Sequence, residues 1–194
     1  MDMAENKPVK KGIPEEKVHL PKGFFKDEVW KKDPETGEET LVENTGWVHN
    51  DIVEGMVKLI AALMKGEIGI QGMMYHAQGE GEPGWDIGGA PVPAWTDVAL
   101  TNEYYRSVPD SIVFLDALDV PTATITNVLL VKTTLDFGDA NGNDGLGRDI
   151  RCQGVFGGDA TAVLDSGMML DEINHTKRWK DPSVKIVRYI KFVF

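Results

Sequence analysis

The side chains able to perform acid–base, nucleophilic or metal chemistry are scattered along this 194-residue chain. Its four histidines, His19, His49, His76 and His175, stand far apart, and none has the spacing of paired metal ligands. Zinc sites combine several histidine or cysteine ligands, and Cys152 is the only cysteine. No serine lies in the Gly-x-Ser-x-Gly turn of a nucleophile elbow. We therefore expect no metal, no cofactor and no enzymatic activity.

Two polar, glycine-rich runs look like ligand-binding loops without matching them. Residues 79–84, Gly-Glu-Gly-Glu-Pro-Gly, lack the lysine and the serine or threonine of a phosphate-binding loop, and their two carboxylates would repel phosphate. Residues 139–145 alternate oxygen-bearing side chains as calcium loops do. An EF-hand needs glycine at the sixth position and an acid at the twelfth, which here are Asp144 and Ile150. We expect a hairpin turn at 139–145, with a looser calcium site as the alternative.

Aromatic residues and two arginines are better suited to binding another molecule than to catalysis. Trp85 and Trp95 lie in the glycine- and proline-rich segment 66–96, which the sequence predicts to be a long loop. Aromatic side chains on such a loop are natural anchors for a protein partner; the alternative is that both fold back onto the core. The other candidate interaction residues are Tyr104, Tyr105, Arg106 and Arg151. Arg151 is expected to pair with an acid such as Glu103, unless these charges are merely solvated.

Only one segment has the pattern of an amphipathic helix, from about Asp51 to Lys65. Apolar residues recur there at helical spacing and define one face: Ile52, Met56, Leu59, Ile60, Leu63 and Met64. Asp51, followed three residues later by Glu54, predicts a capping box at its start. Gly66 is placed to end the helix.

The rest of the chain is typical of β-strands joined by turns. Segments 24–30 and 40–48 flank an acidic turn at 31–39 and predict a β-hairpin. Further strands are expected at 111–115, 122–137, 149–156 and 184–194. In the last of these the apolar face carries Ile186, Ile190, Phe192 and Phe194. We expect a mainly β fold, a β-sandwich-like domain with one packed α-helix.

Composition excludes several classes of function. The chain carries 31 acidic and 20 basic residues, and this net charge of −11 disfavours direct binding to nucleic acid. Its longest apolar run, residues 59–64, is far shorter than the roughly 20 residues of a membrane span, and its N-terminus lacks the apolar core of a secretory signal. One cysteine suits folding in a reducing cytoplasm. We expect a soluble protein that binds neither nucleic acid nor membrane directly.

The N-terminal segment differs from the remainder. Residues 1–22 are rich in lysine, glutamate and proline and cannot bury enough surface to fold alone. We expect an extended N-terminal arm there, followed by a single β-rich domain over residues 23–194. The arm is either a disordered tail or a segment that becomes ordered on a neighbouring subunit.

Three patches of sequence carry a resemblance to a known class of protein. They are residues 50–53 leading into the predicted helix, residues 96–106, and residues 150–156 followed by 165–167 and the closing strand. Together they cover roughly half of the chain and resemble structural proteins of tailed-phage virions, of the decoration, collar or tail-fibre attachment type. In such proteins the third patch often has the pattern Arg-Glu-x-Gly-Leu-Phe. Here Cys152 stands in place of the glutamate, so an ion pair made by that glutamate is not expected.

The resemblance implies a structural subunit of a tailed-phage or phage-derived particle, folded in the host cytoplasm and located in the virion. Its partners would be other virion proteins, such as the major capsid or tail protein, bound through the N-terminal arm and the 66–96 loop. Homo-oligomers are expected, since particle components sit on symmetry axes. The alternative is a carbohydrate- or receptor-binding module, which exposed tryptophan and tyrosine side chains over 66–106 would favour. An enzyme would be favoured only if carboxylates converged in a cleft.

Overall fold

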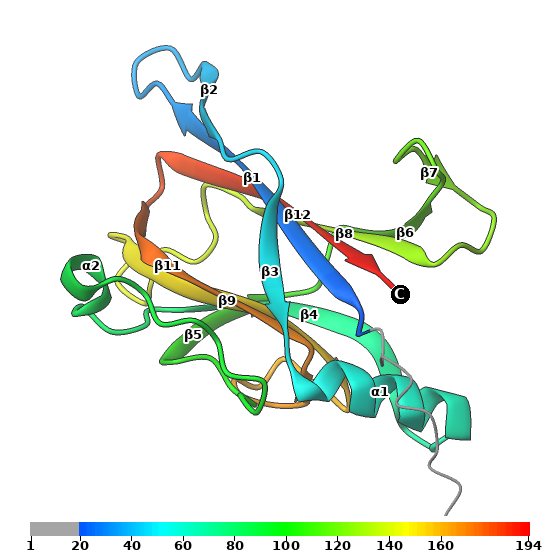
Figure 1. Ribbon diagram of the computed structural model, residues 1–194. Helices are drawn as coiled ribbons and strands as arrows, with labels where there is room; N and C mark the ends of the chain where they lie inside the picture. The colour runs from blue at the N-terminus through cyan, green and yellow to red at the C-terminus, as the bar shows by residue number, and fades with distance from the viewer. Residues whose placement is uncertain (1–19) are drawn as a thin grey trace, which may run out of the picture.

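The computed structural model describes residues 20–194, and the protein is mainly β, with 48% strand and 9% helix (Figure 1). In chain order the described elements are β1 (Lys22–Lys32), β2 (Glu39–Asn44), β3 (Val48–Ile52), α1 (Glu54–Lys65), β4 (Gln71–Gly79), α2 (Trp85–Gly88), β5 (Glu103–Ser107), β6 (Ser111–Leu115), β7 (Pro121–Thr122), β8 (Val128–Leu135), β9 (Arg148–Gly158), β10 (Met168–Met169), β11 (Asp171–Lys180) and β12 (Val184–Val193). The predicted mainly β, sandwich-like fold is confirmed. The predicted arm falls largely on residues 1–19, which lie outside the described residues, and Lys22, its last residue, already begins β1.

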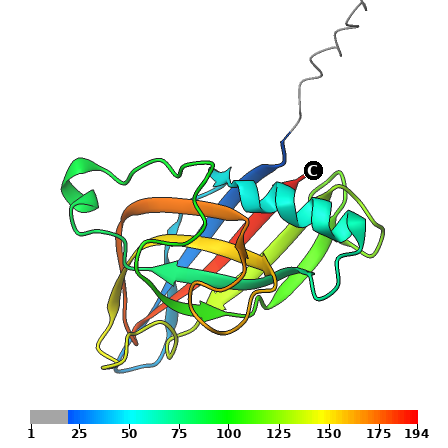
Figure 2. The same cartoon turned by 90° about the horizontal axis from the view of Figure 1, so that it is seen from below.

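The strands form one antiparallel sheet that folds over into two layers (Figures 1 and 2). Its order is β5-β4-β9-β11-β3-β1-β12-β8-β6-β7, with β10 beside β9 and β2 beside β1. β3 lies at the fold between the layers, because it pairs with β1 on one side and, through Asp51 and Ile52 alone, with β11 on the other. The layer of β1, β12, β8 and β6 therefore covers the layer of β11, β9, β4 and β5.

Helix α1 closes one end of the space between the layers (Figure 2). Met56 and Leu59 are buried there in one apolar cluster with Val155, Ile190 and Phe192, which belong to β9 and β12. Full burial of such a side chain contributes roughly 1.5–3 kcal/mol. The predicted packing of a single long helix against the sheet is therefore confirmed.

The start of α1 differs from the prediction, whereas its end matches. Asp51 lies in β3, where it pairs with Glu172, so the expected capping box is wrong. Val53 occupies the N-cap position and makes no side-chain hydrogen bond there. Gly66 ends the helix with a φ of 72°, the left-handed conformation that glycine adopts without strain. Neither helix within residues 20–194 has the length and apolarity needed to cross a membrane.

The predicted long loop at 66–96 contains a strand, and this part of the prediction is wrong. β4 is a central strand that pairs with both β5 and β9. Gly79 allows the strand to pack closely against its neighbour and does not form a turn. A Cβ atom at this position would lie 2.4 Å from the Sγ atom of Cys152. A run that contains Gly72 and Gly79 and has no β-branched residue resembles a loop in sequence. The loop that remains between β4 and β5 carries the short helix α2.

The predicted N-terminal hairpin and C-terminal strand are confirmed. β1 pairs antiparallel with β2, and β12 lies between β1 and β8. Ile186, Ile190 and Phe192 are buried as expected, but Phe194 is 43% exposed and lies outside the core. Residues 139–145 connect β8 in one layer to β9 in the other, so the hairpin turn expected there is wrong.

Candidate functional site

The predicted interaction residues are carried by the β4–β5 connection and by two nearby strands. Trp85 and Trp95 lie in residues 85–98 of the connection, a segment that we call the apolar loop. The strand residues are Tyr104, Tyr105 and Arg106 on β5 and Arg151 on β9. Because β5, β4 and β9 are neighbours in the sheet, these residues fall in one region of the molecule. In Figure 1 the apolar loop includes α2 and continues towards β5.

Arg151 anchors the start of the apolar loop. Its guanidinium forms a bidentate ion pair with Asp86 of α2, at N–O distances of 3.1 and 2.8 Å. It also donates to the carboxylate of Asp149 at 2.7 Å and to the carbonyl of Glu80 at 3.0 Å. Asp86 accepts the backbone N–H of Lys177 from β11 at 2.9 Å, and the hydrogen bond from Arg151 lowers the pKa of Asp86 to about 2. α2 is therefore fixed to both β9 and β11.

Arg151 pairs with acidic side chains as expected, but Glu103 is not one of them, and the strand register explains why. Glu103 pairs with Gly79 of β4, which in turn pairs with Cys152 of β9. Side chains alternate between the two faces of a strand, so Arg151 projects from the face opposite to that of Cys152. The Cys152 thiol lies 3.3 Å from the carbonyl of Thr101 as a hydrogen-bond donor, and burial raises its pKa to about 12.

The end of the apolar loop is anchored at α1 and β11. The carbonyl of Trp95 accepts the backbone N–H of Glu54, the first residue of α1, at 2.8 Å. Asp97 accepts the N–H of Ala94 at 2.6 Å and lies beside the buried Glu172 of β11. Burial, together with the neighbouring Asp97, raises the pKa of Glu172 to about 8. Glu172 is therefore protonated at neutral pH, which allows it to donate to the Asp97 carboxylate.

Beside and between its anchors the apolar loop presents large apolar side chains to solvent. Ile87, Val92 and Val98 are 95%, 81% and 71% exposed. Trp95 is also exposed, whereas Trp85 packs against a buried core cluster. Exposed apolar side chains on one loop are candidates for an interaction site. The sequence analysis predicted the tryptophans as interaction residues but not the three aliphatic residues. The only sequence feature that marks the aliphatic residues is that they are apolar within a glycine- and proline-rich segment.

The Arg106 side chain makes its contacts inside the protein. Its side chain and that of Glu103 are 2% and 0% exposed, and they form a bidentate ion pair at 2.6 and 2.8 Å. The guanidinium also donates to the carbonyl of Thr161 at 2.9 Å, and Glu103 accepts the N–H of Asp165 at 3.0 Å. The pair therefore fastens the turn at 161–166 to β5. Of the predicted interaction residues, both arginines thus hold connections in place.

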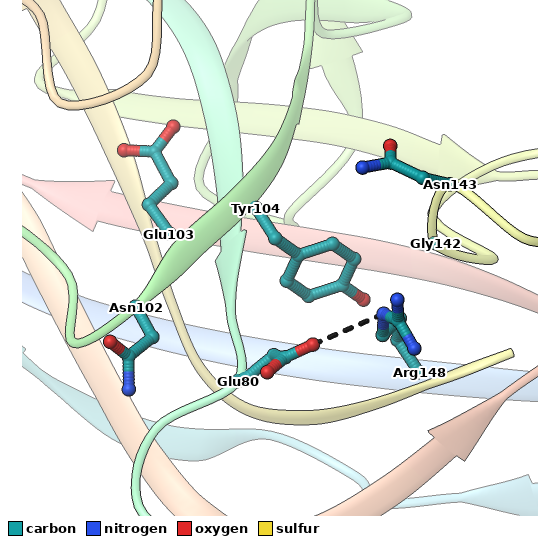
Figure 3. A pocket seen from close by; sticks show the side chains of 7 residues that line it. All are labelled: Glu80, Asn102, Glu103, Tyr104, Gly142, Asn143 and Arg148. Atoms are coloured by element: carbon teal, nitrogen blue, oxygen red, sulfur yellow. Dashed lines mark ion pairs between the residues drawn. The ribbon is translucent and has the colours of Figure 1, made fainter.

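Tyr104 lines a polar groove of about 490 Å³ beside β5 (Figure 3). The lining residues are Glu80, Asn102, Glu103, Tyr104, Gly142, Asn143 and Arg148. Glu80 and Arg148 form an ion pair with 3.2 Å between Oε1 and Nε. A second hollow of about 260 Å³ shares these two residues and adds Pro83 and the half-exposed Trp179. The two hollows lie on either side of one ion pair.

Both tyrosines of β5 are half-buried. The Tyr104 hydroxyl donates to the carbonyl of Ala140 at 3.2 Å, and burial raises its pKa. Burial also raises the pKa of Tyr105 to about 12, so both side chains are neutral at pH 7. The Tyr104 side chain points towards Arg148 in Figure 3, whereas the Glu103 side chain projects from the opposite face of β5. The groove therefore combines hydrogen-bonding side chains with an aromatic ring.

A charged cluster inside the sandwich joins its two layers. The buried Asp27 carboxylate of β1 accepts hydrogen bonds from Arg188 of β12 and Arg178 of β11. His175 and His76 lie beside this cluster, and burial lowers their pKa values to about 4 and about 3. Both imidazoles are therefore neutral at pH 7. Within residues 20–194, no three His, Cys, Asp or Glu side chains converge as a metal ion would require.

No family model matches the chain, and no curated protein matches it by sequence. The function proposed below therefore rests on the residues of this chain and on their geometry.

Proposed function

We propose that this protein is a structural subunit of a tailed-phage or phage-derived particle. In this proposal it assembles with copies of itself and with other virion proteins, such as the major capsid or tail protein. The observation that carries the proposal is the apolar loop, in which exposed apolar side chains lie beside and between two fixed points. The resemblance of three sequence patches to virion proteins supports the same class of particle.

An anchored loop is suited to binding because it is ordered before it meets a partner. The Arg151–Asp86 ion pair and the hydrogen bond between Trp95 and Glu54 fix its two ends. Association then costs little conformational entropy, and burial of an exposed aliphatic side chain contributes roughly 1.5–3 kcal/mol. Trp95 adds aromatic surface of the kind that dominates binding energy at many interfaces.

Other parts of the surface carry similar side chains. Within residues 20–194, the large apolar residues that are more than two-thirds exposed are Met64, Ile68, Ile87, Val92, Val98, Leu118, Ile125, Leu146 and Val163. All except Met64 and Ile87 lie outside the helices and strands. A subunit of a ring contacts one neighbour on each side through different surfaces. Several exposed apolar connections therefore suit a particle component better than a protein with one ligand.

The oligomeric state of the full-length chain tests the proposal. Sedimentation velocity over a range of protein concentrations is expected to show an oligomer whose share rises with concentration. Because a net charge of −11 opposes association, added salt is expected to strengthen it. A protein that stays monomeric at every concentration and salt level would contradict self-assembly.

Deletion of residues 1–19 in the same experiment tests the predicted arm. A fall from oligomer to monomer would assign assembly to the arm. An unchanged oligomer would assign assembly to the described domain, where the apolar loop is the first surface to examine.

A carbohydrate-binding module is the second candidate, and the groove in Figure 3 favours it. Asn102, Asn143 and Arg148 present polar groups that suit sugar hydroxyls. The half-exposed ring of Trp179 lines the adjoining hollow and offers a stacking surface. Titration with soluble oligosaccharides, followed by tryptophan fluorescence, is the test. A monomer that binds them, and loses binding in Trp179→Ala but not in the exposed control Trp47→Ala, would favour this candidate over assembly.

A further inference from the structure

Lys180, the last residue of β11, has a fully buried side chain. A lysine side chain is rarely buried completely unless its ammonium group is paired with another group. Here the Nζ atom donates to Oδ1 of Asn141 at 2.9 Å and to the carbonyl of Asp181 at 3.2 Å. The first contact joins β11 to residues 136–147, the segment between β8 and β9, which we call the polar connection.

Asn141 is held in one orientation by the polar connection. It is 7% exposed, and its Nδ2 group donates to the carbonyl of Phe137 at 2.7 Å. Its own carbonyl accepts the N–H of Gly147 at 2.9 Å. The Oδ1 atom therefore faces Lys180. Because the neighbouring Ala140 belongs to a buried apolar cluster, the contact lies at the edge of the core.

Burial lowers the pKa of Lys180 to about 8, so roughly a tenth of this side chain is a free amine at pH 7. Only the free amine is nucleophilic. The charges of Asp139, Asp181 and Asp136 oppose the shift, and that of Asp139 has the largest effect of the three.

We propose that Lys180 and Asn141 become joined by an amide bond between their side chains. The Nζ atom of Lys180 attacks the Cγ atom of Asn141, and the Cγ–Nδ2 bond breaks. One proton passes from Nζ to Nδ2, and ammonia leaves. The step transfers no electrons to or from an external group and consumes no co-reactant.

The two side chains are already close to a reactive arrangement. The Cγ atom of Asn141 is one C=O bond from Oδ1, about 1.23 Å, and therefore lies within about 4.1 Å of Lys180 Nζ. Groups held at about 3–3.5 Å in a fixed orientation react as if at very high concentration. A small rotation of the Asn141 side chain is sufficient to reach that range.

The bond would tie the two layers of the sandwich together. Asn141 follows β8 of one layer, and Lys180 ends β11 of the other, 39 residues further along the chain. A cross-link of this span stabilises a protein by restricting its unfolded chain, as a disulfide does. We expect it to raise Tm by on the order of 10 °C. This property goes beyond the assembly proposed above, and either proposal can fail without the other.

The mass of the intact, purified protein tests the bond. The wild type is expected to be lighter than its sequence by the mass of one ammonia molecule. Proteolysis is expected to release a branched peptide that joins Asn141 to Lys180. Lys180→Arg keeps a positive charge but lacks the nucleophile, so we expect it at full mass, as we expect Asn141→Ala.

The arginine variant is also the chemical control. Ring closure at the Asn141–Gly142 sequence loses ammonia too, but it needs no lysine. A loss of ammonia that persists in Lys180→Arg would therefore overturn the proposal. So would a wild-type protein at full mass after long incubation at about pH 9, where most of the Lys180 amine is uncharged. The wild-type mass and its peptides decide the matter even if the variants fail to fold.

Discussion

The apolar loop and the polar connection are two glycine-rich segments of similar length that are built in opposite ways. The apolar loop is fixed only near its ends and turns Ile87, Val92 and Val98 to solvent. The polar connection turns the Asn141 side chain inward, where it holds the ammonium of Lys180. One segment is therefore available for contacts outside the chain, whereas the other contributes to the stability of the fold.

Removal of the buried Lys180 side chain is expected to have the largest effect on stability. Lys180→Met leaves the Asn141 side chain and the Asp181 carbonyl without their donor and removes the proposed cross-link. We expect the free energy of unfolding to fall by about 2–5 kcal/mol, measured by urea titration. Leu146→Ser, an exposed position of the same connection, is the matched control and is expected to change little. Equal unfolding free energies of the two variants would show that the contact of Lys180 with the polar connection does not stabilise the fold.

Loss of an anchor is expected to loosen the apolar loop with a smaller effect on the whole protein. Arg151→Met leaves the Asp86 carboxylate without its main partner. We expect a loss of about 1–3 kcal/mol in unfolding free energy and faster hydrogen exchange over residues 85–98. Lys177→Met is the control, because the bond from Lys177 to Asp86 is made by its backbone N–H. Unchanged exchange in Arg151→Met would show that the loop does not depend on this anchor.

The second anchor is expected to respond to pH. Burial raises the pKa of Glu172 from 4.5 to about 8, so the folded state keeps a proton that the unfolded state releases. Stability therefore falls as the pH rises from about 4.5 to about 8, by at most about 1.4 kcal/mol per pH unit. Asp171, with a pKa raised to about 7, acts in the same direction. His76 and His175 act oppositely only below about pH 6.5, and Lys180, with a pKa lowered to about 8, acts oppositely above about pH 7.

Urea titrations at pH 7 and pH 8 measure this dependence. The wild type is expected to be less stable at the higher pH, and Glu172→Gln is expected to show a flatter dependence. The exposed Glu82→Gln serves as control, with the slope of the wild type. The same slope in Glu172→Gln and wild type would mean that this carboxyl group does not titrate in the window.

The smallest effects on stability are expected at the exposed residues of the apolar loop. Ile87→Ser, Val92→Ser and Val98→Ser should each change the unfolding free energy by less than about 0.5 kcal/mol, because the side chains are mostly in water already. A larger loss would place these side chains in the core of the protein and would remove them as candidates for assembly.

The sequence predicts the parts of the fold that follow from regular alternation. The hairpin of β1 and β2, the C-terminal strand β12 and the single long helix α1 all have clear apolar periodicity, and all three form. β4 escapes prediction because Gly79 is required by the close approach of Cys152 and not by a turn. A single sequence does not distinguish a glycine that permits a turn from one that permits close packing.

The candidate site is less predictable, since it depends on which strands become neighbours. Glu103 and Arg151 are both buried charged residues, but the register through β4 places them on different faces and gives each another partner. The importance of Lys180 is equally hidden. Its contact with Asn141 depends on a connection between two layers, and nothing in the local sequence of either residue reveals it.

Assembly through the apolar loop is tested by the solution mass of one variant. Sedimentation velocity is run on the full-length wild type, on the triple variant Ile87→Ser, Val92→Ser and Val98→Ser, and on the control Val42→Ser, a half-exposed position of β2. The account predicts an oligomer for the wild type and the control, and a shift to monomer for the triple variant. A triple variant that remains folded and keeps the wild-type mass would contradict it, as would a wild type that is monomeric throughout.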